Sequence, residues 1–154
     1  MRYFLFPILV TFFLGCSQKN YTSKESYLIT FKSKELKFSD MGFISKNDDS
    51  ILVDIFSVGN QVLKLEMGSF ISVNDGVPTP YSFFNKKVFQ SEYPSKTVKY
   101  IFSGSPIFDG KNLEKTSDGF SQHIGENILY KVSKKSTYFK DKMNGVLIKI
   151  VKLK

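Results

Sequence analysis

Apolar and polar residues alternate with a period of two along most of this chain, which is the pattern of β-strands with one buried face. Ile51, Val53 and Ile55 fall on one face of such a run, and Leu63 and Leu65 on one face of the next. The runs that predict strands are residues 26–31, 35–38, 51–56, 62–67, 70–73, 128–133, 137–142 and 146–153.

Turn-forming residues separate these runs, so consecutive strands are expected to pair as antiparallel hairpins. Residues 47–50 (Asn-Asp-Asp-Ser) predict a turn, and residues 58–61 (Val-Gly-Asn-Gln) join two strands. Asn144 and Gly145 favour a type I′ turn before the last strand, which requires positive φ at both positions. Residues 109–125 are rich in Gly, Ser and Asp and are expected to form a long connection with one strand at most.

The middle of the chain changes to helical spacing. Val98, Ile101 and Phe102 stand at i, i+3 and i+4 between Pro94 and Gly104, which predicts a helix over residues 94–103. Residues 81–90 fit either a second short helix or an irregular aromatic loop. The fold class is therefore β-rich α+β, an antiparallel sheet or small sandwich of about six to eight strands with one or two short helices inserted near residues 81–104.

The amino-terminal residues have the order of a secretion signal. Arg2 precedes an apolar stretch over residues 3–14, which is too short to span a hydrocarbon core of about 30 Å. Gly15 and Cys16 follow, and residues 17–20 are abruptly polar. The segment Phe-Leu-Gly-Cys at residues 13–16 resembles the lipobox of bacterial lipoproteins. This resemblance implies cleavage between Gly15 and Cys16, diacylglycerol on the Cys16 sulfur and acylation of the new amino terminus.

This interpretation divides the chain into a cleaved signal peptide (1–15), a lipid-anchored flexible tether (16–25) and one globular domain (26–154). The chain contains no cysteine besides Cys16, so it has neither a disulfide nor a cysteine-based metal site. We expect a location in the cell envelope, attached to a membrane through the lipid. Ser17 after the lipid-bearing cysteine implies, by resemblance to other lipoproteins, the outer membrane and its periplasmic face.

The positive charge consists almost wholly of lysine. The chain has a formal net charge of +8, and removing residues 1–15 deletes Arg2 and no acid, which leaves +7. Arginine is the residue that proteins favour for bidentate phosphate contacts, so its absence from the mature chain argues against a nucleic-acid partner. A diffuse attraction to an anionic envelope lipid, or to a glycan such as lipopolysaccharide, is compatible with this charge.

Residues that support catalysis are sparse. His123 is the only histidine, and Asp118 and Ser121 near it do not by themselves predict a catalytic triad. Asp48 and Asp49 fall in a predicted turn, where aspartate commonly bonds the local backbone. We therefore expect a protein that is not an enzyme and has no catalytic residue, metal or cofactor apart from the covalent lipid on Cys16.

Aromatic residues are dense between residues 81 and 102. Short helices cannot bury every ring of this segment, so Phe83, Phe84 and Phe89 are the candidate partner surface. The first functional hypothesis is a non-catalytic interaction or assembly subunit with an envelope protein partner. The alternative is a binding module for an anionic envelope lipid or glycan, and a hydrolase that uses His123 is the third hypothesis.

Overall fold

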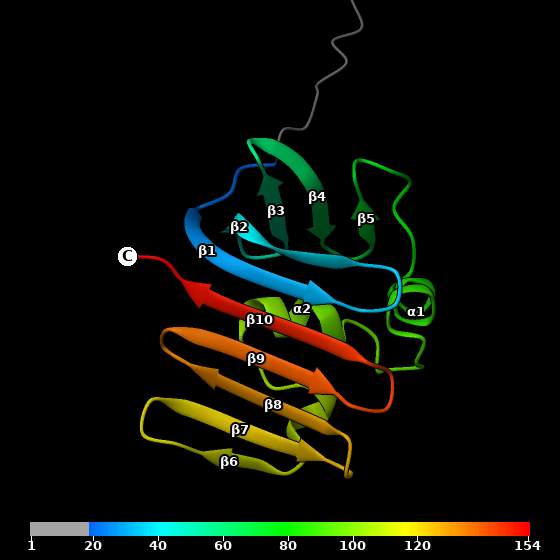
Figure 1. Ribbon diagram of the computed structural model, residues 1–154, viewed down its shortest axis with the longest axis vertical. Helices are drawn as coiled ribbons and strands as arrows, with labels where there is room; N and C mark the ends of the chain where they lie inside the picture. Colours follow the sequence, from blue (N-terminus) through cyan, green and yellow to red (C-terminus); the bar gives the residue numbers. More distant parts are fainter. Residues whose placement is uncertain (1–18) are drawn as a thin grey trace, which may run out of the picture.

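Ten antiparallel strands form one continuous sheet in the computed structural model, which describes residues 19–154 (Figure 1). The order across the sheet is β5-β4-β3-β2-β1-β10-β9-β8-β7-β6. The strands are β1 (Ser23–Lys32), β2 (Lys37–Lys46), β3 (Ile51–Ser57), β4 (Asn60–Met67), β5 (Ile71–Val73), β6 (Leu113–Lys115), β7 (Gly119–Ile124), β8 (Ile128–Ser133), β9 (Ser136–Asp141) and β10 (Val146–Lys152). The β-rich α+β class is confirmed, and the structure has the single antiparallel sheet of the two expected alternatives. The sheet has ten strands, more than the six to eight expected, because the stretch expected to be a long connection contains both β6 and β7.

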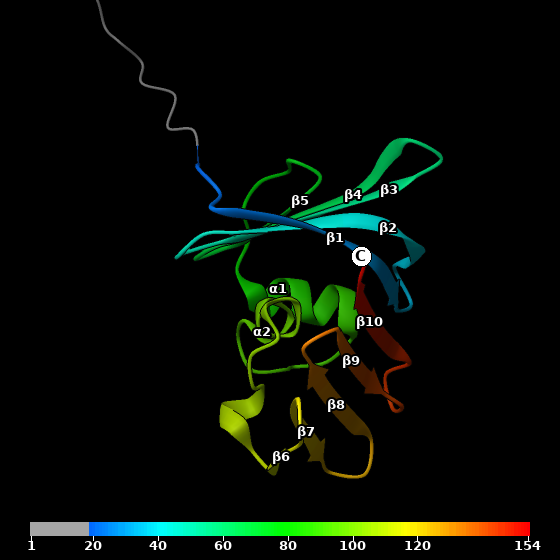
Figure 2. The ribbon, with the colours of Figure 1, turned by 90° about the vertical axis from the view of Figure 1, so that its left-hand side faces the viewer.

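The sheet consists of two five-strand meanders that meet where β1 pairs with β10. Ile29 lies opposite Ile150 and Phe31 opposite Ile148 in this antiparallel pair, and all four side chains are buried. Strands β1 to β5 lie along one side of the molecule, and β6 to β10 turn away from them around the interior (Figure 2). The inward face of each half is therefore apolar, as the alternation predicts.

Short helices fill the space inside the curled sheet. They are α1 (Tyr81–Phe84), the π-helical turn η1 (Asn85–Phe89), α2 (Thr97–Ser103) and the 3-10 turn η2 (Phe108–Gly110). In Figure 2, α1 and α2 lie beneath the β1–β5 half, on the side that faces β8 and β9. Gly104 ends α2 with a φ of 72°, the left-handed conformation common at helix carboxyl ends.

Buried aromatic rings connect the two halves through the helical layer. Phe31 of β1 lies 6.0 Å from Phe89, and Phe89 lies 5.2 Å from Tyr93, measured between ring centroids. Tyr93 packs edge-on against Phe139 of β9 at 6.1 Å, and Phe139 packs against Tyr130 of β8 at 6.3 Å. Each ring is buried, so this chain of contacts is a major part of the core.

Two buried polar side chains fasten loops to this core. The Asp141 carboxylate accepts hydrogen bonds from the Tyr93 hydroxyl and from the backbone N–H of Met143 and Asn144. Burial, together with the hydrogen bond to Asp141, raises the pKa of Tyr93 above its usual range. Gln122 of β7 both donates to and accepts from the backbone of Ile107, each at 2.9 Å, so its amide is fully engaged inside the protein.

Several boundaries differ from the sequence predictions. Strand β1 begins at Ser23, so the last three residues of the expected tether (16–25) belong to the sheet, and the Thr22 N–H donates to the Lys46 carbonyl at 2.9 Å. Residues 23–25 pair with β2, but all three are polar, so this part of the strand has no alternation of apolar and polar residues that would predict it. Strand β2 covers residues 37–46 instead of 35–38, α2 begins three residues later than expected, and the long connection contains both β6 and β7.

The turn between β9 and β10 is also different. Gly145 has a φ of 64°, but Asn144 does not have the positive φ that a type I′ turn requires, so that prediction is wrong. Val146 pairs with Asp141, which leaves a four-residue loop held by the Asp141 carboxylate. The β3–β4 turn does meet the type I′ condition, with φ values of 49° at Val58 and 80° at Gly59.

Replacement of Gly145 by valine tests the left-handed position in the β9–β10 loop. Nothing lies within 4 Å of a Cβ at this position, so crowding is absent and backbone strain is the sole penalty. Gly145→Val should lower the free energy of unfolding by about 1 to 3 kcal/mol, measured by chemical denaturation of the purified protein. Gly145→Asn is the matched control and should cost less, because asparagine tolerates positive φ. Equal midpoints for all three proteins would contradict this loop conformation.

Candidate functional site

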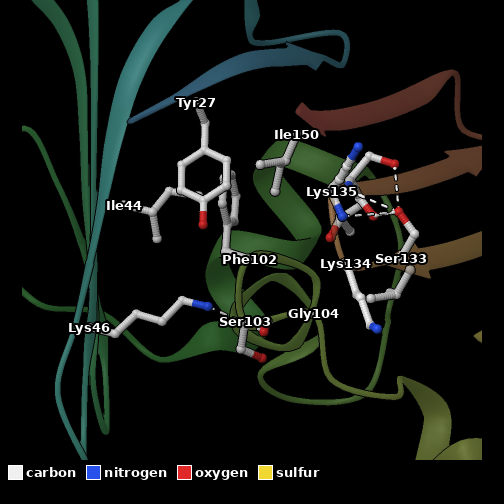
Figure 3. Close-up of a pocket in the computed structure, with 13 residues that line it drawn as sticks. Tyr27, Ile44, Lys46, Phe102, Ser103, Gly104, Ser133, Lys134, Lys135 and Ile150 are labelled. Atoms are coloured by element: carbon white, nitrogen blue, oxygen red, sulfur yellow. Dashed lines mark hydrogen bonds between the residues drawn. The ribbon is translucent and has the colours of Figure 1, made fainter. Parts of the chain in front are cut away.

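A lysine-walled pocket lies at the junction of the two halves of the sheet. It has a volume of about 200 Å³ and is bounded by β1, β2 and β10, by the end of α2 and by the turn between β8 and β9. Figure 3 shows Lys46 reaching in from one wall, while Lys134 and Lys135 stand on the opposite wall. Residues far apart in the sequence thus enclose one space because β1 pairs with β10.

Lys46 is the half-buried cation of this pocket. Its Nζ atom donates a hydrogen bond to the backbone carbonyl of Ser103, the last residue of α2, at 3.3 Å. A helix carboxyl end favours a cation, so this contact holds the ammonium group at the pocket. Burial lowers the pKa of Lys46, which means that the charged form has lost part of its hydration. An ammonium group has three N–H donors, so two remain for a ligand.

Glu25, the carboxylate whose charge acts on Lys46, is already engaged. Glu25 accepts a hydrogen bond from Lys152 Nζ at 2.6 Å and another from the Tyr27 hydroxyl at 2.5 Å. The contacts with Lys152 and Tyr27 lower the pKa of Glu25, so it stays ionised and offsets the charge of Lys152. Within residues 19–154, Lys46, Lys134 and Lys135 form no ion pair. The charge of Glu25 also acts on Lys46 and partly offsets it, so the pocket keeps a net positive charge without an ion pair of its own.

Hydroxyl groups and an apolar floor complete the pocket. The Ser133 and Ser136 hydroxyls lie 3.1 Å apart, and Ser133 Oγ also accepts from the Ser136 N–H at 3.0 Å, which fixes the turn that carries Lys134 and Lys135. The floor is made by apolar side chains of β2, α2 and β10, namely Ile44, Phe102 and Ile150 (Figure 3). This combination suits an anionic group attached to an apolar or sugar-like body.

Two of the three residues expected to form a partner surface are part of the core. Phe84 and Phe89 are buried, and their rings pack edge-to-face at 5.7 Å, whereas Phe83 is 58% exposed. The π-helical turn explains the difference, because its wider period brings Phe84, Val88 and Phe89 to the buried side together. A regular α-helix would turn Phe89 away from Phe84. The three-residue surface is therefore not formed.

The other candidate residues stay apart from the pocket. Asp118 and His123 are exposed, and no hydrogen bond joins either of them to Ser121 within the described part of the chain. The turn at residues 47–50 is confirmed, since Asn47 Oδ1 accepts from the N–H groups of Asp49 and Ser50. Residues 19–154 contain no cluster of three metal-ligating side chains. No helix in the same range is long and apolar enough to cross a bilayer, and Gly15 and Cys16 lie outside the described residues.

Sequence reasoning missed all three pocket lysines. Lys134 and Lys135 are adjacent between the predicted strands 128–133 and 137–142, and two lysines there are typical of a solvated hairpin tip. Lys46 precedes them by almost ninety positions. The pairing of β1 with β10 places Lys46 across the pocket from these two lysines, and no local sequence pattern predicts that pairing. The pocket thus depends on long-range strand order.

Comparisons with known protein families, with curated protein sequences and with solved structures find no match to this chain.

Alanine substitution distinguishes core rings from surface rings in the aromatic segment. Phe89→Ala should lower the free energy of unfolding by about 3 to 5 kcal/mol, because it removes a fully buried ring that contacts Phe31 and Tyr93. Phe83→Ala is the matched control and should change it by no more than about 0.5 kcal/mol. Denaturant titration of the purified variants measures both values, and a large loss at Phe83 would contradict its exposed position.

Proposed function

We propose that this protein is a lipid-anchored component of the cell envelope whose domain is a non-catalytic binding module for an anionic lipid or glycan. The observation that carries the proposal is that Lys46, Lys134 and Lys135 line one pocket, and that no carboxylate of residues 19–154 forms an ion pair with them. A desolvated cation beside an apolar floor attracts an anion more strongly than the same cation on an open surface.

The volume of the pocket limits the size of the ligand that it can enclose. Sites that enclose a drug-sized molecule have volumes of roughly 300 to 1,000 Å³. The volume here is about 200 Å³, which fits a headgroup or a single anionic sugar substituent in place of a complete lipid. The rest of the ligand would lie over the rim, where Lys134 and Lys135 are exposed.

The pocket favours this function over an assembly role. The interaction hypothesis depended on exposed rings at Phe83, Phe84 and Phe89, and two of these are buried. A single exposed phenylalanine is common on protein surfaces and does not identify a protein partner. The aromatic segment therefore does not support an envelope protein partner.

The proposed anchor explains how such a domain stays at the envelope. Cys16 precedes Lys19, the first described residue, by only three positions, so a lipid there would hold the domain close to the bilayer. We propose attachment to the outer membrane on its periplasmic face, on the strength of Ser17. A conventional signal peptide cleaved at another position is the alternative to test.

Replacement of Cys16 tests the anchor. Cys16→Ser should block lipidation and processing, so the variant should stay in the aqueous phase. The wild-type protein should partition into the detergent phase, because two or more acyl chains bury far more apolar surface than a single myristoyl group. Intact mass of the membrane-extracted wild-type protein is the measurement. A mature chain that begins elsewhere, or that lacks the lipid mass, would overturn the lipoprotein assignment.

Neutralisation of the pocket lysines tests the binding site. The triple variant Lys46→Gln, Lys134→Gln, Lys135→Gln should bind lipopolysaccharide or phosphatidylglycerol at least about tenfold more weakly, since each charged hydrogen bond contributes about 1.5 to 3 kcal/mol. Binding is measured by calorimetry on the full protein in neutral detergent, at low and high salt, and added salt should weaken the wild-type interaction. Comparison of the two titrants separates a lipid ligand from a glycan ligand.

A matched triple variant removes the same charge elsewhere. Lys86, Lys87 and Lys142 are exposed and lie outside the pocket, so their replacement by glutamine should leave most of the binding intact. If both triple variants weaken binding equally, the attraction is diffuse and the pocket is not the site. If neither titrant binds the wild-type protein, the proposed function is wrong.

A further inference from the structure

The outward face of the β1–β4 half bears an apolar patch that the pocket does not involve. Leu28 lies opposite Met41, and Met41 lies opposite Phe56, so the three side chains adjoin across three neighbouring strands on the face away from the helices. Leu28 is 41% exposed and Met41 is 59% exposed. Phe43 extends the patch and packs edge-on against Phe56, with ring centroids 5.9 Å apart.

Val58 at the tip of the β3–β4 hairpin enlarges this patch. It is 97% exposed and has a φ of 49°, a conformation that a β-branched side chain rarely adopts. Asparagine is the usual residue before glycine in a type I′ turn, so valine makes this turn less stable than asparagine would. Figure 2 shows the hairpin bending away from the helical layer. A depression of about 350 Å³ between Met41, Phe43, Phe56 and Val58 connects the tip to the sheet face.

Two lysines flank the patch, and Asp54 lies opposite Phe43 with its carboxylate bonded to Gln61. Lys24 Nζ lies 4.5 Å from the centroid of the Phe43 ring, and Lys149 is exposed on the outward face of β10, the strand next to the one that carries Leu28. An apolar centre with a lysine border matches the interface of a bilayer that contains anionic lipids, where apolar side chains enter the acyl boundary and ammonium groups contact phosphates.

The chain enters the domain on this same side. Lys19 forms an ion pair with Glu66, and Glu66 points outward from β4 because its neighbours Leu65 and Met67 point into the core. Lys19 follows Cys16 by three positions, which is a reach of about 10 Å for an extended chain. A lipid on Cys16 would therefore enter the bilayer beside the outward face of β4.

We infer that the outward face of β1–β4, from Leu28 to the Val58 tip, lies against the lipid bilayer. The inference takes its tether length from the lipid anchor of the proposed function, and it is independent of the lysine pocket. The pocket is lined by inward-facing residues of the sheet and by the end of α2, so a bilayer on the outward face would not cover it.

Tryptophan fluorescence tests this orientation, because the chain contains no tryptophan. Met41→Trp and, separately, Val58→Trp are made in the full lipidated protein and reconstituted into phosphatidylcholine and phosphatidylglycerol vesicles. Brominated acyl chains should quench both emissions at least about twofold more than that of Met143→Trp, and the emission should be blue-shifted. Met143 is the matched control, since it is 76% exposed in the β9–β10 loop of the other half.

The outcomes separate a bilayer from other occupants of the patch. Quenching no greater than at Met143 overturns the inference, and a blue shift without bromolipid quenching indicates a second copy or another protein and also overturns it. Val58→Asn should raise the thermal midpoint in detergent, yet reduce the quenching of the Met41→Trp emission in vesicles. A lower midpoint, or unchanged quenching, would contradict the role assigned to the strained valine.

Two controls keep this inference distinct from the proposed function. The pocket variant Lys46→Gln, Lys134→Gln, Lys135→Gln should leave the bromolipid quenching of Met41→Trp unchanged, whatever its effect on lipopolysaccharide binding. The mass of the reconstituted protein is measured first, so loss of the anchor is recognised separately from a lipidated domain whose patch does not touch the bilayer.

Discussion

The pairing of β1 with β10 is the constraint on which the rest of the structure depends. It is the point at which the two five-strand meanders become one sheet, through six residue pairs from Tyr27–Lys152 to Lys32–Leu147. Each half alone would expose an apolar inward face. The joined sheet curls around the helical layer and buries the inward faces of both halves. The pair joins residues near opposite ends of the chain, so much chain entropy must be lost before its contacts form, and slow folding is expected.

The same junction creates the candidate binding site. The Lys152 N–H donates to the Lys135 carbonyl at 2.9 Å, while the Thr22 N–H donates to the Lys46 carbonyl at 2.9 Å, so backbone bonds position both lysine-bearing walls. The pocket walls are thus as rigid as the sheet ends from which they come, and only the lysine side chains need to adapt to a ligand. Such preorganisation lowers the entropic cost of binding for a site with few donors.

The sequence predicted the elements whose signal is local and missed those whose signal is not. Ile51, Val53 and Ile55 identified β3 because its alternation reports one buried face. The polar residues 23–25 concealed the start of β1, since that stretch is held by backbone bonds to β2 alone. Phe84 and Phe89 were assigned to a partner surface because short helices were not expected to bury every ring, whereas the π-helical turn brings both to the buried side. The lysine pocket was out of reach for a different reason: its members meet only through strand order, which composition and periodicity do not encode.

The positions of the lysines in the structure are more informative than their number. Lys19, Lys64 and Lys152 have the carboxylate partners Glu66, Asp75 and Glu25, and each pair keeps a partner substantially open to solvent, so these contacts contribute little to stability. Lys46 is different, because it is half-buried and bonded to a backbone carbonyl, and it faces two more cations without a carboxylate between them. The cost at Lys46 is the partial loss of its hydration, which an anion in the pocket would offset. The net charge alone would fit any lysine-rich protein, whereas a half-buried lysine in a pocket is the specific feature on which the proposed anion site rests.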